Sequence, residues 1–313
     1  MSDELLVPLD GSELAEAALP WAALLARRED LSLVLLRATP FPPYFAAVLE
    51  GDRREELLAP EQAATHEYLA RVGQWLTDQG VHVETVVREG EPADVIRDLA
   101  KGRGPMGIVM ATHGHGGLSR LVLGSVAARV AGETTTPLLL VHAQPSVARG
   151  APALSRILVP VDGSALAEGA LPWARSLLPA GGTLILTRIV SDHDEAPRSE
   201  ARAEAEIYLA RLAGAERPAD GTVETVVRVG RPSEAIRAAA RETQADLIVL
   251  ATHGRTGLQR ALLGSVADAV LREADVPVLL TSARALATRR NDEFPGHIRN
   301  GATTPQGIGA SPS

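Results

Sequence analysis

Short runs of Leu, Val and Ile alternate along the chain with longer stretches in which apolar residues recur at helical spacing. Such runs are typical of buried strands, and such stretches of amphipathic helices. In the first half, the predicted strands lie near residues 5–9, 31–38, 81–87, 106–111 and 137–142. The predicted helices lie near residues 12–27, 61–79, 92–101 and 125–132. This alternation predicts an α/β fold, a parallel sheet with helices on its faces.

The pattern occurs twice because the sequence itself is duplicated. The segment LLVPLDGSELAEAALPWA from Leu5 returns as ILVPVDGSALAEGALPWA from Ile157, and ATHGHGGLSRLVLGSVA from Ala111 returns as ATHGRTGLQRALLGSVA from Ala251. The strands of the second copy are predicted near residues 156–161, 182–190, 222–228, 246–251 and 277–282. Because crossovers between consecutive parallel strands are right-handed, we expect two tandem, doubly wound, five-stranded parallel-sheet domains.

Segments without periodicity mark the expected boundaries. Residues 145–152 are rich in Ala, Gly and Ser and are predicted to form a linker. The predicted units are a first domain at 1–144, a second domain at 153–283 and a disordered tail at 284–313. The segment 40–60 has no counterpart of equal length in the second copy, and a lid, a contact surface and a simple insertion all fit it.

Composition narrows the classes of partner. The chain of 313 residues has a formal net charge of −8, and this argues against nucleic acid, which normally requires a basic surface. It contains no Cys, which excludes disulfides and thiolate zinc sites. No apolar run reaches the roughly 18 residues that a membrane span requires, and the start of the chain lacks the pattern of a signal peptide. We therefore expect a cytoplasmic protein without a membrane partner.

The candidate chemistry lies in the loops after the first and fourth predicted strands, because ligands of doubly wound sheets bind where the strand order reverses. Gly124 and Gly264 each stand directly before a predicted helix. A missing Cβ and the free N–H groups of a helix start favour an anion such as phosphate, and Ser125 and Ser265 add a hydroxyl. Taken alone, each Gly-Ser pair is more typical of an ordinary helix cap.

The loop before each of these pairs also contains glycine. Gly114 and Gly254 allow the chain to turn around a polyphosphate. Arg255 carries a permanent positive charge where the first copy has His115, which slightly favours the second copy as a phosphate site. A histidine precedes each glycine; these are His113 and His253. Taken alone, they are more typical of loop hydrogen bonds than of a ligand contact.

An Asp-Gly-Ser sequence follows the first predicted strand of each copy. Asp10 and Asp162 are typical of turns in this setting and are also candidates for contact with a ligand. All of these elements recur together at fixed spacing, and all fall on one end of a predicted sheet. That coincidence favours a binding site over a set of unrelated turns and caps.

These motifs resemble those of the universal stress protein family, whose ATP-binding members carry Gly, two residues, Gly, nine residues, and then Gly-Ser or Gly-Thr. Nine residues separate Gly114 from Gly124, and nine separate Gly254 from Gly264. The segments VPLDGS, VPVDGS, TPLLLV and VPVLLT are also similar to the family's, and the resemblance extends over residues 5–282. The sequence departs from the motif at its first glycine, which is replaced in the two copies by Ala111 and Ala251.

The resemblance implies an adenine nucleotide alpha hydrolase-like fold that binds ATP, with Mg²⁺ or Mn²⁺ held mainly by phosphate oxygens and water rather than by protein ligands. It implies that the aspartates meet the adenine edge, that Ala38 and Ile189 line the base pocket, and that the glycines and serines hold ribose and phosphates. The implied site residues are Pro8, Asp10, Ala38, Met110, His113, Gly114, Gly124, Ser125 and Val126 in the first copy, and Pro160, Asp162, Ile189, Leu250, His253, Gly254, Arg255, Gly264, Ser265 and Val266 in the second.

The resemblance also bears on activity and assembly. Some family members dimerise without ATP, so a stress scaffold that binds no nucleotide is the alternative to a nucleotide-responsive regulatory protein. No GxxxxGK[ST] or GxSxG motif is present, and we therefore expect slow ATP hydrolysis at most. Members commonly pair through their last strands, so the two copies are expected to form an internal pseudo-dimer, and a homodimer of the chain is a further possibility.

Overall fold

The structure is a computed structural model that describes residues 2–39, 52–112, 123–142, 152–191, 198–218, 220–252 and 263–282. The strands of the first copy are β1 Ser2–Pro8, β2 Ser32–Thr39, β3 Val83–Glu89, β4 Pro105–Ala111 and β5 Leu138–Val141. Those of the second copy are β6 Arg156–Pro160, β7 Thr183–Val190, β8 Thr222–Val229, β9 Leu247–Thr252 and β10 Val278–Ser282. Neighbouring strands are parallel within each copy, which confirms the predicted α/β class.

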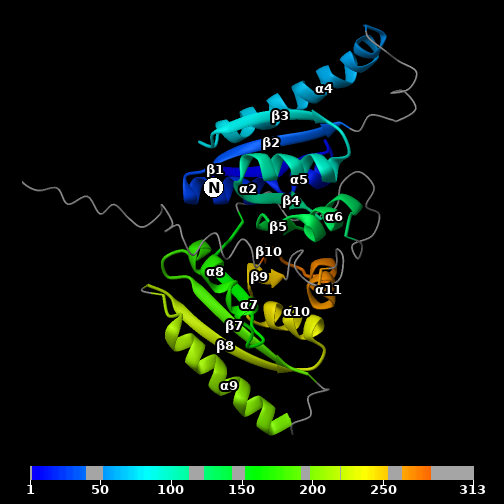
Figure 1. Ribbon diagram of the computed structural model, residues 1–313. Helices are drawn as coiled ribbons and strands as arrows, with labels where there is room; N and C mark the ends of the chain where they lie inside the picture. The colour runs from blue at the N-terminus through cyan, green and yellow to red at the C-terminus, as the bar shows by residue number, and fades with distance from the viewer. Residues whose placement is uncertain are drawn as a thin grey trace, which may run out of the picture.

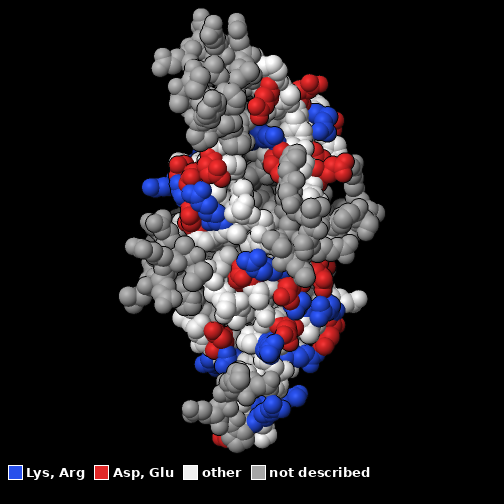
Figure 2. Space-filling model, turned by 90° about the vertical axis from the view of Figure 1, so that its right-hand side faces the viewer, with Lys and Arg blue, Asp and Glu red and all other residues white. Residues whose placement is uncertain are grey.

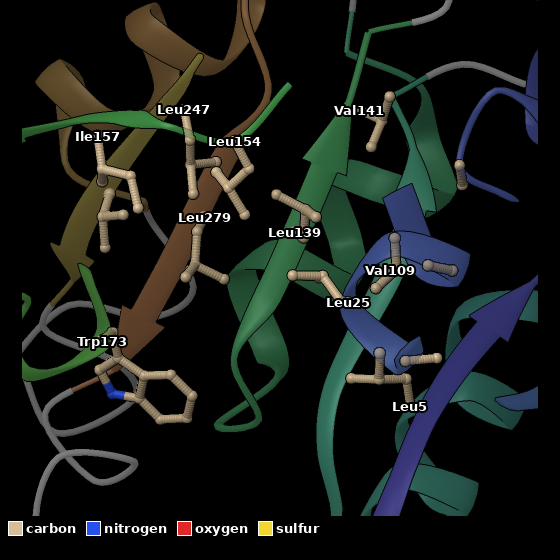
Figure 3. Packing of buried hydrophobic residues seen from close by; sticks show 14 of the residues in the cluster. Leu5, Leu25, Val109, Leu139, Val141, Leu154, Ile157, Trp173, Leu247 and Leu279 are labelled. Carbon is tan, nitrogen blue, oxygen red and sulfur yellow. The ribbon is translucent and has the colours of Figure 1, made fainter. Parts of the chain in front are cut away.

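The ten strands form one continuous sheet in the order β3-β2-β1-β4-β5-β10-β9-β6-β7-β8. The two copies join through their last strands, which are antiparallel, with Leu139 of β5 opposite Leu279 of β10. Figure 3 shows these two leucines side by side at the junction, with Leu25 and Trp173 nearby. The two predicted sheets are therefore halves of a single larger sheet.

Ten helices of the described residues cover the sheet on both sides (Figure 1). In the first copy they are α1 Glu13–Glu16, α2 Leu19–Glu29, α4 Asp52–Thr77, α5 Pro92–Arg103 and α6 Ser125–Glu133. In the second copy they are α7 Ala165–Glu168, α8 Leu171–Leu177, α9 Arg198–Ala215, α10 Pro232–Glu242 and α11 Ser265–Glu273.

Alternate residues of each strand belong to two different cores, because successive side chains of a strand point to opposite faces. Leu33 and Leu35 pack with α2, α4, α8 and α9 in one core, and we call this side of the sheet the α2 face. Val34 and Leu36 pack with α5, α6, α10 and α11 in the other, which we call the α6 face. Both cores contain residues of both copies, so the duplication is also a single packing unit.

Two helices differ from the prediction. The helix expected near 12–27 is divided into α1 and α2, because Pro20 has no N–H with which to bond the carbonyl of Glu16 and instead lies in the first turn of α2. The helix expected near 61–79 begins earlier, at Asp52. Part of the segment 40–60 is therefore helical, and residues 40–51 lie outside the described residues.

Other expectations fall outside the described part of the chain. Residues 145–151 of the predicted linker and the whole predicted tail at 284–313 lie outside the described residues. Among the residues that the structure describes, no helix is long and apolar enough to cross a membrane.

Candidate functional site

The strand order reverses between β1 and β4 in the first copy and between β6 and β9 in the second. Doubly wound sheets bind their ligands in a crevice outside the carboxyl ends of the strands at such a point, so this edge of each copy is where a ligand crevice is expected. The ladder between β1 and β4 runs as far as Leu6 opposite Ile108, although both strands continue beyond that pair. In the second copy the ladder between β6 and β9 likewise runs as far as Leu158 opposite Ile248. Neighbouring strands diverge at such a switch point, and their crossovers lie on opposite faces.

The Asp-Gly-Ser turn of the first copy lies on one side of this crevice. Gly11 has a φ of +80°, a left-handed conformation that favours glycine. The Oδ1 atom of Asp10 accepts hydrogen bonds from Ser12 N at 3.0 Å and from Ser12 Oγ at 2.5 Å. Ser12 Oγ in turn accepts from Ala15 N at 3.1 Å and caps α1. The turn is therefore rigid, and its aspartate is held in one orientation.

The turn of the second copy has the same construction. Gly163 has a φ of +85°, Asp162 Oδ1 accepts from Ser164 N at 2.9 Å, and Ser164 Oγ accepts from Ala167 N at 3.1 Å. Partial burial raises the pKa of the Asp162 carboxyl, but the hydrogen bonds from Ser164 and the charge of Arg188 outweigh it, so the pKa lies below its ordinary value. The aspartate is a carboxylate at neutral pH, an acceptor without a proton to donate.

Strand alternation brings several predicted site residues of each copy to the same face. Leu6, Leu36 and Met110 belong to the core of the α6 face, and Pro8 and Ala38 follow two positions later on the same side of their strands. In the second copy, Leu250 and Ile189 pack in that core as well. The α6 face therefore carries the residues expected to line the base pocket. The corresponding residue of β6 is Pro160.

The start of α6 closes the crevice of the first copy. Gly124 N donates to Thr112 O at 2.8 Å, and Thr112 N donates to Val141 O at 2.9 Å, so the helix start is tied to the ends of β4 and β5. Gly124 is the N-cap and has no side chain with which to cap the helix, in contrast to Ser12 of α1. The first N–H groups of a helix lack internal partners, and such groups suit an anion. Ser125 is exposed there, and Val126 packs on the core of the α6 face.

The second copy repeats this arrangement with a difference in charge. The helix α11 also lacks a side-chain cap, and among the described residues no atom lies within 4 Å of a Cβ built on Gly264. Ser265 is exposed, and Val266 packs on the core of the α6 face. However, Asp268 lies in the first turn, and its carboxylate is paired with Arg272 at 2.9 and 3.0 Å. This ion pair offsets a charge that would otherwise disfavour phosphate.

Both helix starts face the same side of the molecule. The helices α6 and α11 lie on the right in Figure 1, and Figure 2 looks directly at that side. Acidic and basic side chains are interspersed over the described part of this surface in Figure 2, without one large basic patch. The glycine loops that lead into both helices lie outside the described residues, and with them His113, Gly114, His253, Gly254 and Arg255.

Further residues, to which no sequence motif points, lie behind the Asp-Gly-Ser turns, on the α2 face. Each copy places an arginine, a tyrosine and a glutamate there, and we call these the Arg-Tyr-Glu clusters: Glu16, Arg37 and Tyr68 in the first copy, and Glu168, Arg188 and Tyr208 in the second. Their recurrence in the duplicated sequence is the signal that could have found them, since only three tyrosines occur in the chain.

Two further features limit the chemistry that the described residues offer. No group of three or more His, Asp or Glu side chains among them has the arrangement of a metal site. A cavity of about 280 Å³ lies away from the crevices, between α10 and the segment before β10. Its two arginines are already paired, Arg237 with Glu273 and Arg241 with Asp275 at 3.1 Å, so it offers no free cationic group.

These features define the class of the protein: a tandem, doubly wound α/β protein with one strand switch point in each half-sheet. The profile of the universal stress protein family matches residues 1–142 and again residues 154–282. The chain therefore belongs to the universal stress protein family.

Relatives of the same tandem length support this assignment. A universal stress protein of Mycolicibacterium smegmatis is 29% identical over 298 residues, which cover 90% of this chain and 97% of that protein. A universal stress protein of Mycobacterium tuberculosis is 30% identical over 292 residues, which cover 88% of this chain and 95% of that protein.

Solved structures agree on the fold. The crystal structure of a universal stress protein from Archaeoglobus fulgidus matches 90% of this chain and 99% of its own with a TM-score of 0.69, at 22% identity. Another universal stress protein was solved in complex with cAMP; it matches 41% of this chain and 96% of its own with a TM-score of 0.33, at 24% identity. The latter likeness is too low to indicate a ligand for this chain.

Proposed function

We propose that this universal stress protein binds ATP or a related adenine nucleotide in one or both crevices and acts as a nucleotide-responsive regulatory protein. The observation that carries the proposal is the duplicated pair of an uncapped helix start and an aspartate turn at the same strand switch point. The helix start suits a phosphate chain, and a carboxylate suits the exocyclic amino group of adenine. A nucleotide with its base at the aspartate turn and its phosphates at the helix start would contact both elements.

The proposed contacts follow from these positions. Asp10 and Asp162 would accept from the base, with Ala38 and Ile189 beside it on the α6 face. The N–H groups at the starts of α6 and α11, with Ser125 and Ser265, would donate to phosphate oxygens. Gly114, Gly254 and Arg255 complete the phosphate loops in this proposal, and Mg²⁺ or Mn²⁺ would be bound mainly by phosphate oxygens and water.

The two alanines in place of the motif's first glycine favour a second candidate, a stress scaffold that binds no nucleotide. Ala111 is buried at the end of β4, and Ala251, at the matching position of β9, packs against the core of the α2 face, so each adds a methyl group at the end of its strand where the motif has none. A nucleotide-free scaffold would act through its surface and its assembly, for which a homodimer is the simplest form.

Calorimetric titration with Mg²⁺ and ATP separates the two candidates. We expect saturable binding to the unaltered chain and at least a tenfold loss in the double variant Gly124→Glu and Gly264→Glu, because two carboxylates would crowd and repel the phosphates. The matched control is Gly102→Glu with Gly214→Glu, which adds the same charge on exposed helix surfaces of α5 and α9. Equal affinities in all three proteins would reject the site, and no binding by the unaltered chain would favour the scaffold.

A further inference from the structure

The Arg-Tyr-Glu clusters repeat residue by residue although their members are far apart in the sequence. In each copy the arginine stands third from the end of the second strand, the tyrosine on the long helix α4 or α9, and the glutamate on the short helix α1 or α7. Three elements of the fold are thus needed to assemble one cluster. A surface charge pair does not require three elements. The repetition of the cluster in both copies indicates a common role.

The second copy shows the contacts within the cluster. The Tyr208 hydroxyl donates to Glu168 Oε1 at 2.7 Å. Burial, and then the neighbouring Glu168 carboxylate, raise the pKa of Tyr208, whereas the charge of Arg188 acts in the opposite direction. The same guanidinium stabilises the ionised form of Asp162. Arg188 therefore lies within electrostatic reach of both the tyrosine and the aspartate of the turn.

The first copy shows how the arginine meets the turn. A Cβ built on Gly11 would lie 2.6 Å from Arg37 Nη1, so the guanidinium packs directly against the Asp-Gly peptide. The Cζ atom of Arg37 lies 6.0 Å from the centroid of the Tyr68 ring. Nε and Nη1 of Arg37 are buried and have no hydrogen-bond partner within the part of the chain that the structure describes. A buried cation in this position is costly unless its charge is used.

The clusters act from behind the crevice. Arg37 follows Leu33 and Leu35 on the α2 face, and the rings of Tyr68 and Tyr208 pack against the core of that face. Ala38, which is proposed to line the base pocket, lies on the α6 face. The arginine therefore does not share the crevice with the base, and any effect on a ligand passes through the aspartate of the turn.

We propose that Arg37 and Arg188, which lie near the tyrosine of their clusters, are positioning residues for Asp10 and Asp162 and thereby determine selectivity for purines with a 6-amino group. The inference rests on the proposed function, because it assumes that the aspartates meet the base. A fixed carboxylate accepts a hydrogen bond from the amino group of adenine but repels the 6-oxo group of hypoxanthine, which is itself an acceptor. The phosphate contacts are the same for ATP and inosine triphosphate.

The test compares the affinities of these two nucleotides in the full-length chain. The unaltered protein is expected to prefer ATP over inosine triphosphate, and Arg37→Met with Arg188→Met is expected to reduce that preference by about tenfold, the usual value of one hydrogen bond to a charged group. The affinity for inosine triphosphate should change much less, because the phosphates still bind. If the arginines have a merely structural role, the double variant should lose affinity for both nucleotides equally, and that result would overturn the proposal.

Controls separate the possible failures. Arg241→Met removes one exposed arginine at the opposite end of the sheet and should leave the preference unchanged. If the double arginine variant does not fold, Tyr68→Phe with Tyr208→Phe keeps both rings and should still lower the preference for ATP. An unaltered preference in that variant would also overturn the proposal. Failure of the unaltered chain to bind either nucleotide would reject the proposed function itself, together with this inference.

Discussion

Gly11 and Gly163 have the same left-handed conformation but different neighbours. Arg37 Nη1 lies 2.6 Å from the position of a Cβ on Gly11, whereas no atom lies within 4 Å of one on Gly163 among the described residues. Both glycines have a positive φ, which residues with a side chain disfavour. Only Gly11 also lacks the space for a Cβ atom. The two copies therefore offer a comparison of strain alone with strain plus packing.

Alanine at these positions should destabilise the protein unequally. Gly163→Ala is expected to lower the free energy of unfolding by about 1 kcal/mol through backbone strain. Gly11→Ala should cost about 1 kcal/mol more, because the buried guanidinium must also move. Urea denaturation of the two variants measures the difference, and equal losses would show that Arg37 does not pack against the turn.

At the scale of elements, one arginine joins three of them at the amino end of the first half-sheet. Arg103, at the end of α5, donates to Glu4 Oε1 of β1 at 2.8 Å and to Glu84 Oε2 of β3 at 2.6 Å. The hydrogen bonds from Arg103 are the main reason why the pKa of Glu4 and the pKa of Glu84 lie below their ordinary values, against the effect of burial. The edge strand β3, α5 and the central strand β1 are thereby linked.

This link predicts a pH dependence of stability. Because the folded-state pKa of each carboxyl is lowered, its contribution is complete above the unfolded-chain value of 4.5 and is lost as the pH falls through the folded-state value. Arg103→Met should lower the free energy of unfolding by about 1 kcal/mol at pH 7, since both partners are partly exposed, and should make the protein less sensitive to acid. The measurement is urea denaturation between pH 3 and about pH 7.

The control for this prediction is Arg231→Met. Arg231 is largely exposed and pairs with Glu234, one turn away, at 3.4 Å. Its loss should change stability by less than about 0.5 kcal/mol and leave the pH profile unaltered. A profile for Arg103→Met that parallels that of the unaltered chain would contradict the proposed role of the link.

At the scale of the whole molecule, the junction of the two copies is part of the core. A small cavity of about 50 Å³ is lined by Leu25 and Leu139 of the first copy and by Trp173 and Leu279 of the second. Trp173, on the short helix α8, is only 4% exposed. Side chains of both copies therefore contribute to one packed junction.

This shared core predicts one cooperative unfolding transition for both copies. Calorimetry should give a single transition whose van't Hoff and calorimetric enthalpies agree. Trp173→Ala should lower the free energy of unfolding by about 3–5 kcal/mol, and Trp75→Ala, at a position that is 45% exposed, by much less. Two separate transitions in the unaltered chain would show that the copies are independent domains.

The sequence predicted the strands well because each is an aliphatic run between turn residues, and the duplication fixed the number of units. The pairing of β5 with β10 was expected from the family resemblance and not from the residues of those strands, which are uniformly apolar. The Arg-Tyr-Glu clusters could not be predicted from local patterns, because residues as distant as Glu16 and Tyr68 meet only in the folded chain. The break between α1 and α2 was missed because the apolar spacing continues across Pro20.

The central claim is that one or both of the strand switch points bind an adenine nucleotide. Hydrogen–deuterium exchange of the unaltered chain with and without Mg²⁺ and ATP tests the claim and its location together. In each copy that binds, we expect slower exchange in the Asp-Gly-Ser turn and in the first turn of α6 or α11, where N–H groups would bond to phosphate. Unchanged exchange there, or protection confined to the cavity beside α10, would contradict the account.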